Sequence, residues 1–129
     1  MALDVAKGMN FMHIQEPQIL HRDLKSLNLL VVETVNSQFD YVQVKVTDFG
    51  LARTLNEMQT MAPGGGGAHM TGLAGTFHWM APEVLASQAN YSHKADIYSY
   101  GIVMWEIMAR EPPFKGLRPH EIMAKVLNN

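Results

Sequence analysis

Apolar residues in the first part of the chain follow two different spacings. Ala2, Val5, Met9 and Met12 lie three or four positions apart, which predicts an amphipathic helix over the first dozen residues that ends before Pro17. Two β-rich runs follow, "LNLLVVETV" and "YVQVKVTDF", separated by "NSQFD". These runs predict a β-hairpin with a polar tip.

The second half of the chain combines an irregular stretch with a strongly apolar one. Residues 51–75 contain "APGGGG" and several threonines without periodicity, which predicts a long loop. From Ser92 onward, apolar residues fill one helical face and most of the remainder, so we expect a helix that is buried on most sides. "REPPF" ends that helix, and "PHEIMAKVLNN" begins another. The apolar face is marked by Ile97, Gly101, Met104 and Met108.

The composition fits a globular chain of mixed charge. Of its 129 residues, 47% are hydrophobic and 17% are charged, and the formal net charge is -2. Burial can therefore offset chain entropy, in one compact unit or in part of a larger one, and no basic field favours nucleic acid as a partner. The sequence contains no cysteine, no signal peptide and no run long enough to span a membrane. We therefore expect an intracellular, cytoplasmic protein without a membrane partner.

One polar loop, "HRDLKSLN", lies between the first helix and the hairpin. It contains "HRD" at residues 21–23 and Asn28, and it is followed by "DFG" at residues 48–50 and "APE" at residues 81–83. At about one in twenty for each of the seven letters in the first two motifs, a chance match is on the order of 10⁻⁹ per placement. In this order the motifs resemble those of a protein kinase catalytic domain. "HRDLKSLN", "GTFHWMAPE" and "REPPF" are most similar to the tyrosine-kinase-like group of serine/threonine kinases, and the resemblance covers the whole chain.

These residue types suit phosphoryl transfer from ATP to a protein hydroxyl. The transition state is loose in most analyses, so the protein mainly positions the acceptor and neutralises phosphate charge. The resemblance implies that Asp23 orients the acceptor hydroxyl and that Lys25 places a cation beside the transferred phosphate. Asn28 and Asp48 offer the hard oxygen ligands that Mg²⁺ prefers. Together with Lys25, they would also hold the ATP phosphates.

The resemblance gives further residues a role in recognition or regulation. Leu30 matches the position that packs beneath the adenine ring, although a plain core leucine is equally compatible. Thr76 matches a substrate-positioning threonine that contacts the catalytic aspartate and lysine in serine/threonine kinases. Arg22 resembles the arginine that pairs with a phosphorylated activation segment, with Thr71 as the leading phosphosite and Thr60 as the alternative. An upstream activating kinase or autophosphorylation would supply that phosphate.

The resemblance also implies two buried contacts that hold the polar loop. His21 and Phe49 would stack in the core behind the site. Asp96, near the start of the second long helix, would accept backbone N–H groups from the loop and keep it rigid. An ordinary aspartate in the first turn of a helix is the alternative for Asp96.

Some elements of the family pattern are not in this sequence. A Gly-rich loop, a strand lysine and a helix glutamate should precede "HRD", but only twenty residues precede His21 and none of these elements is among them. The last helices of the family are missing too, including the arginine that pairs with Glu83 of "APE". We therefore expect residues 1–129 to form part of a kinase domain. The expected fold is an α+β, mainly helical fragment of the C-terminal lobe with a small β-hairpin.

Two functions remain open at this point. One is ATP- and Mg²⁺-dependent phosphorylation of serine or threonine in a protein substrate. The other is a catalytically inactive, pseudokinase-like or truncated module that acts in docking or regulation. Intact Asp23, Asn28 and Asp48 argue for the enzyme, whereas the missing upstream half argues against activity of these residues alone. A dual-specificity enzyme that also modifies tyrosine is a weaker third possibility, which Lys25 disfavours.

Overall fold

The computed structural model describes residues 1–54, 76–86 and 92–128. In chain order, with η for a 3-10 turn, the elements are α1 (Ala2–His13), β1 (Ile19–Leu20), η1 (Ser26–Asn28), β2 (Leu29–Val31), β3 (Val44–Val46), η2 (Phe49–Leu51), β4 (Arg53–Thr54), η4 (Phe77–Trp79), α3 (Pro82–Leu85), α4 (His93–Ala109) and α5 (Pro119–Leu127). The α+β, mainly helical fold with a small hairpin confirms the predicted fold class.

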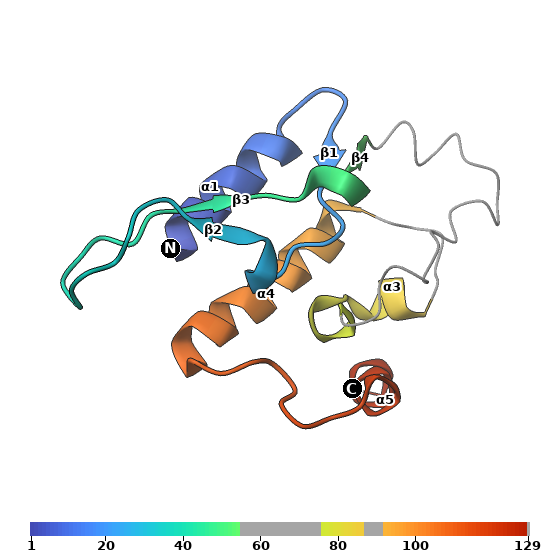
Figure 1. Ribbon diagram of the computed structural model, residues 1–129. Helices are drawn as coiled ribbons and strands as arrows, with labels where there is room; N and C mark the ends of the chain where they lie inside the picture. Colours follow the sequence, from blue (N-terminus) through green and yellow to red (C-terminus); the bar gives the residue numbers. More distant parts are fainter. Residues whose placement is uncertain (55–75, 87–91, 129) are drawn as a thin grey trace.

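The elements are arranged around the two long helices. Figure 1 shows α1 and α4 side by side, with the β2–β3 hairpin projecting from the α1 side and α3 and α5 at the opposite end of the molecule. The short strands β1 and β4 pair antiparallel near the end of α1. The polar loop (residues 21–28) runs between these elements, from the end of β1 to the start of β2.

The first predicted helix is confirmed as α1. It ends at His13, before Pro17, and it buries Val5, Met9 and Met12. Gly8 lies where the hairpin approaches α1, because a Cβ atom at this position would stand 3.1 Å from a Val46 methyl carbon. A larger residue would require the Val46 side chain to move by a few tenths of an ångström.

The predicted hairpin with a polar tip is also confirmed, although its strands are shorter than the predicted runs. At the tip, the Asp40 carboxylate accepts the backbone N–H groups of Asn36 and Ser37 at 2.8 and 2.9 Å. Residues 32–41 are exposed, so no second layer covers them within the described chain, and regular pairing is confined to the base. The antiparallel register is Leu29↔Val46, Leu30↔Lys45 and Val31↔Val44.

Asp4 ties the hairpin to α1. Its carboxylate accepts hydrogen bonds from the Tyr41 hydroxyl at 3.0 Å and from the backbone N–H of Val44 at 3.4 Å. Burial raises the pKa of Asp4, but the hydrogen bonds from Tyr41, the chain's amino terminus and Val44 lower it by more, so the net pKa lies below the ordinary value. The hydrogen bond between Tyr41 and Asp4 raises the pKa of the Tyr41 hydroxyl.

The ends of α4 agree with the prediction. The Ser92 side chain accepts the backbone N–H of Lys94 at 3.2 Å, which caps the first turn. The helix ends at Ala109, and Arg110 adopts a left-handed conformation with φ of 56°. The predicted stop at "REPPF" is therefore confirmed, and the helix predicted in "PHEIMAKVLNN" is α5.

The predicted burial of α4 on most sides is wrong. One face packs against α1 and η4, and its buried residues include Asp96 and Val103. The opposite face is apolar but exposed, because no described element packs against it. Its exposed residues are Ile97 (48%), Gly101, Trp105 (45%) and Met108 (79%).

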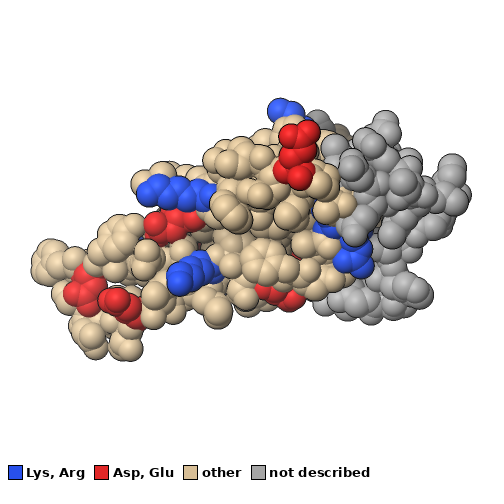
Figure 2. Space-filling view, turned by 90° about the horizontal axis from the view of Figure 1, so that it is seen from above, with Lys and Arg blue, Asp and Glu red and all other residues tan. Residues whose placement is uncertain are grey.

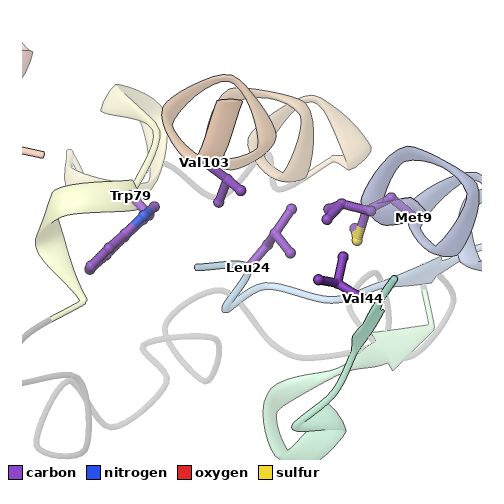
Figure 3. Packing of buried hydrophobic residues seen from close by; sticks show 6 residues of the cluster. Met9, Leu24, Val44, Trp79 and Val103 are labelled. Atoms are coloured by element: carbon purple, nitrogen blue, oxygen red, sulfur yellow. The ribbon is translucent and has the colours of Figure 1, made fainter. Parts of the chain in front are cut away.

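The core lies between the polar loop, α4 and the hairpin. Figure 3 shows side chains from these elements pointing toward one another, with Leu24 of the polar loop between Val103 and Val44. The cluster consists of Val5, Met9, Leu24, Val44, Trp79 and Val103. Because Leu24 is 1% exposed, the polar loop is part of the core and is held at its centre.

The surface carries charges of both signs. Figure 2 shows separate blue and red patches on a largely uncharged face, with acidic side chains toward the hairpin end. Within the described residues, no helix is both long enough and apolar enough to cross a membrane.

Candidate active site

The polar loop is held by Asp96 in the first turn of α4. The Asp96 side chain is 3% exposed, and its two oxygens accept the backbone N–H groups of His21 and Arg22, each at 2.9 Å. His13 Nε2 lies 2.8 Å from Asp96 Oδ2. Arg22 has a positive φ of 71°, so these bonds also stabilise a backbone conformation that L residues rarely adopt. The predicted role of Asp96 is confirmed, and the alternative of an ordinary first-turn aspartate is wrong.

His21 joins the polar loop to the end of the hairpin. It is fully buried, and its Nε2 lies 3.0 Å from the carbonyl oxygen of Thr47. Since a carbonyl can only accept, Nε2 carries the proton, and Nδ1 accepts the backbone N–H of Asp23 at 3.3 Å. The backbone N–H of Thr47 donates to the carbonyl of Asn28 at 2.9 Å. Thr47 is therefore bonded to both ends of the polar loop, and Asp48 is the next residue in the chain.

Asp23 is the buried acid of the loop. Its Oδ2 accepts from Lys25 Nζ at 2.7 Å and from Asn28 Nδ2 at 3.2 Å, and its backbone carbonyl accepts from the same amide at 2.8 Å. Its Oδ1 is buried and has no hydrogen-bond partner within the described part of the chain. One carboxylate oxygen is thus fixed by a cation and an amide, while the other can accept a proton donor.

Lys25 links Asp23 to Thr76. The ammonium nitrogen lies 3.1 Å from Thr76 Oγ1 as well as 2.7 Å from Asp23 Oδ2. Lys25 is 15% exposed and Thr76 is 5% exposed, so both bonds are shielded from water. The contact of Thr76 with the lysine is therefore present, and Thr76 reaches the aspartate through Lys25.

Asn28 and the residue before Asp48 are joined by a backbone hydrogen bond, so both segments meet at the base of the hairpin. The Asn28 amide nitrogen donates to two acceptors on Asp23, which fixes the orientation of the amide and leaves Oδ1 outside these bonds. Asp48 is exposed, has a positive φ of 63°, and accepts the backbone N–H of Gly50 at 3.4 Å. Among the described residues, no group of three or more His, Asp or Glu could hold a metal by itself.

Two apolar residues beside the loop are exposed. The rings of His21 and Phe49 are in contact, with centroids 5.6 Å apart, but Phe49 is 54% exposed. Its predicted place in the core is wrong, because no described element covers its outer side. Leu30 is 58% exposed, so the alternative of a plain core leucine is also wrong. Leu30 pairs with Lys45, on the hairpin face opposite to the one that α1 covers.

The predicted regulatory residues fall in two groups. Arg22 is described, and its Nη1 donates to the carbonyl of Leu51 at 3.4 Å. Thr71 and Thr60 lie outside the described residues, as does most of the predicted long loop. The beginning of that loop differs from the prediction, because residues 51–54 complete η2 and form β4, which pairs with β1.

Glu83 of "APE" lies in the first turn of α3, after Pro82 at the first helical position. Burial raises the pKa of the Tyr98 hydroxyl, and the charge of Glu83 raises it further. Glu83 is therefore close enough to α4 for its charge to act on that helix.

Sequence reasoning missed several polar residues that hold the site. Ser99 Oγ donates to the Trp79 carbonyl at 2.7 Å, and the Glu106 carboxylate accepts from Ser26 and Trp79. A signal was present, because residues 96, 99 and 106 share one helical face with Val103. This polar face was missed because most of the neighbouring residues in the helix are apolar.

Asp23 is thus bonded to Lys25 and Asn28 within the polar loop, and the hairpin that leads to Asp48 is bonded to the same loop through Thr47. The protein kinase domain family matches residues 1–129, and the chain belongs to this family. The predicted resemblance to serine/threonine kinases of the tyrosine-kinase-like group is confirmed by similar proteins.

Three relatives illustrate the similarity. The chain is 42% identical to "Probable serine/threonine-protein kinase drkC" of Dictyostelium discoideum, over 98% of the chain and 15% of the relative. It is 39% identical to "Mitogen-activated protein kinase kinase kinase" of Drosophila melanogaster, over 99% of the chain and 10% of the relative. It is 44% identical to "Serine/threonine-protein kinase STY17" of Arabidopsis thaliana, over 92% and 17%. The chain thus spans between 10% and 17% of the length of these relatives.

Proposed function

We propose that the chain carries the catalytic-loop, metal-binding and activation-segment part of a serine/threonine protein kinase that uses ATP and Mg²⁺. The observation that carries the proposal is the Asp23 carboxylate, with Oδ2 bound by Lys25 and Asn28 and Oδ1 buried without a partner within the described residues. A proton acceptor thus lies beside a cation and an amide. Two of the three relatives are serine/threonine-protein kinases by name, which supports protein hydroxyls as the substrate class.

Asp23 orients the acceptor hydroxyl and takes its proton late in the transfer. A carboxylate is too weak a base to remove a hydroxyl proton before the new P–O bond begins to form. Because Lys25 and Asn28 occupy Oδ2, Oδ1 is the atom left for the incoming hydroxyl. Positioning is therefore the main contribution of Asp23.

Lys25 and Thr76 act on the other reacting groups. The Lys25 ammonium is a compact cation that offsets charge on the transferred phosphoryl group, and its place is set by Asp23 and Thr76. Thr76 positions the substrate segment relative to Lys25. This pair favours serine and threonine over tyrosine as acceptors.

The residues present fit a magnesium–nucleotide site. Asn28 Oδ1 and the Asp48 carboxylate are hard oxygens on two segments that the Thr47–Asn28 backbone hydrogen bond joins, and Mg²⁺ typically takes one or two protein oxygens together with phosphates and waters. When bound, Mg²⁺ neutralises charge on the ATP phosphates. Leu30 offers an exposed apolar side chain for the adenine ring on the hairpin face away from α1.

Regulation is proposed to act through Arg22. A phosphate on Thr71, or alternatively on Thr60, would pair with the Arg22 guanidinium and order the segment between η2 and η4. An upstream kinase or autophosphorylation supplies the phosphate. Mass spectrometry of active enzyme that finds no phosphate within residues 54–76 contradicts this regulation.

Residues 1–129 alone are not expected to transfer phosphate. Kinase sites hold ATP between two lobes, and one wall would leave the phosphates in water, where electrostatic stabilisation is weak. The test uses a fusion in which residues 1–129 replace the matching part of the Dictyostelium relative's kinase domain, beside that relative's unaltered domain as the positive control. We expect the fusion to phosphorylate a serine/threonine substrate protein and the Asp23→Asn fusion to lose this activity. A folded fusion without Asp23-dependent transfer contradicts the proposal and favours the inactive docking or regulatory module.

A further inference from the structure

The inward face of α4 carries three polar residues, of which only Asp96 has been given a distinct role above. Asp96, Ser99, Val103 and Glu106 lie three or four residues apart, so they share one face of the helix. Val103 is fully buried in the core, and the three polar residues beside it all bond to segments that build the site. Glu106 differs from the other two because it reaches two of these segments at once.

Glu106 joins the polar loop to η4. Ser26 Oγ donates to Glu106 Oε1 at 2.8 Å, and Trp79 Nε1 donates to Oε2 at 3.1 Å, so each carboxylate oxygen has one donor. Trp79 is 6% exposed, and its indole N–H can only donate, so it needs an acceptor within the protein.

These bonds close a ring that includes the contact between Lys25 and Thr76. The backbone N–H of Trp79 donates to the Thr76 carbonyl at 3.2 Å, and Thr76 Oγ1 is bonded to Lys25 at 3.1 Å. Lys25 precedes Ser26 in the chain, and Ser26 leads back to Glu106. The separation of Lys25 and Thr76 is therefore fixed directly by their own bond and indirectly through Glu106.

We propose that Glu106 is a positioning residue that sets the polar loop and η4 at the separation at which Lys25 and Thr76 meet. Its kinetic consequence rests on the function proposed above, whereas the bonds can be tested without any phosphoryl transfer. Glutamine can replace the carboxylate, because its oxygen accepts from Trp79 while its NH₂ group donates to the Ser26 hydroxyl. Leucine has a similar size and can bond to neither partner.

The first test observes the Trp79 indole N–H by NMR in residues 1–129. We expect Glu106→Leu to move this resonance and to raise its hydrogen-exchange rate by about 10-fold or more. Glu106→Gln should restore most of the protection, and Glu111→Leu, the same change at an exposed glutamate just after α4, should leave the resonance unchanged. An unmoved Trp79 resonance in folded Glu106→Leu protein overturns the proposal.

The second test measures kinetics in the fusion protein. Glu106→Leu should lower kcat/KM for a peptide substrate by about 10- to 100-fold, because a small misplacement of a reacting group has an effect of this order. The KM for ATP should stay within about twofold. Glu106→Gln should recover most of the loss, and Glu111→Leu should behave like the parent. Rates are compared per folded molecule, because a smaller folded fraction would lower the apparent kcat without any change at the site. Unchanged peptide kcat/KM in folded Glu106→Leu fusion overturns the proposal.

Single-donor variants keep the inference testable if Glu106→Leu does not fold. Ser26→Ala and Trp79→Phe each remove one bond to Glu106, and because either one opens the ring, their effects on peptide kcat/KM should be less than additive. Full additivity, or no effect of either variant, overturns the proposal. If the unaltered fusion transfers no phosphate, the proposed function is contradicted, and the NMR result alone decides the role of Glu106.

Discussion

The polar loop and the Asp48–Gly50 segment carry the two acidic residues of the site, but the fold holds them in different ways. In the loop, Leu24 is 1%, Asn28 5% and Asp23 7% exposed, and buried Asp96 binds two of the loop's backbone N–H groups. The three residues 48–50 are all exposed, and the hydrogen bond from Gly50 to Asp48 lies within the segment itself. In the loop, the same residues therefore stabilise the fold and form the proposed site. In the segment, the site residue Asp48 contributes little to the stability of the fold.

The two regions also hold left-handed residues by different means. Arg22, with φ of 71°, is held by Asp96 of α4. Asp48, with φ of 63°, has a short polar side chain that tolerates this conformation and bonds locally to Gly50. Changes in the loop should therefore affect both folding and activity, whereas changes in the segment should affect ligand binding alone.

The largest expected effect comes from exchanging the two acids for their amides in the fusion protein. Asp23→Asn should lower kcat by about 100- to 10,000-fold, with little change in ATP affinity, because Asp23 faces the acceptor and not the nucleotide. Asp48→Asn keeps the backbone conformation but removes a charged ligand, so it should weaken Mg²⁺-dependent nucleotide binding by at least about 10-fold. Nucleotide titration and single-turnover assays check both. The division of roles is wrong if both variants lose turnover at unchanged nucleotide affinity.

The next effect concerns the free energy of unfolding of residues 1–129. Asp96→Ala should lower it by about 3 kcal/mol or more, because one buried and one partly buried backbone N–H group would lose their acceptor and His13 would lose its partner. Asp48→Asn, at an exposed aspartate and with a residue that also tolerates the left-handed conformation, should alter it by about 1 kcal/mol at most. Urea unfolding measures both. Equal losses in the two variants would remove the contrast between the regions.

Two leucine-to-alanine variants test the same contrast between a buried and an exposed position with apolar side chains. Leu24→Ala should cost about 2–5 kcal/mol, since Leu24 is 1% exposed and packs at the centre of the core. Leu30→Ala should cost less than about 1 kcal/mol, because Leu30 is 58% exposed. If Leu30 receives the adenine ring, the same variant should weaken ATP binding in the fusion. Similar stability losses would mean that Leu30 is packed as Leu24 is.

Local spacing was enough to predict α1, α5, the hairpin and the ends of α4. The family resemblance was enough to predict the anchor at Asp96, because an aspartate near the start of the second long helix has that role in the family. The burial of individual side chains could not be predicted from local spacing or from the resemblance. The exposed apolar face of α4 and the exposed rings of Phe49 and Trp105 depend on which elements pack nearby, and spacing along one segment carries no information about that.

The Glu106 contacts were hidden for another reason. Ser26 and Glu106 are 80 residues apart, and Trp79 and Glu106 are 27 apart, so neither pair produces a local pattern. A polar residue on an otherwise apolar helix can nevertheless indicate the inward face. It does so when it lies at helical spacing from a residue already known to face inward, such as Asp96. Ser99 and Glu106 satisfy that spacing, and Ile97 and Met108 do not.

The smallest expected effect is the pH response of the hairpin that leads to Asp48. The folded-state pKa of Asp4 lies below the ordinary value of 3.8, so its bonds to Tyr41 and Val44 stabilise the fold above that pH and are lost as the pH falls through the lowered pKa. As the pH is lowered below 3.8, NMR should show the Tyr41 ring and the Val44 amide shifting together with the Asp4 carboxyl carbon. In Asp4→Asn protein this joint transition should disappear, while at neutral pH the His21 amide keeps its parent resonance because Asp96 holds it independently. A shift of the His21 amide in Asp4→Asn protein would show that the hairpin and the polar loop are coupled, and the separation of the two regions would then fail.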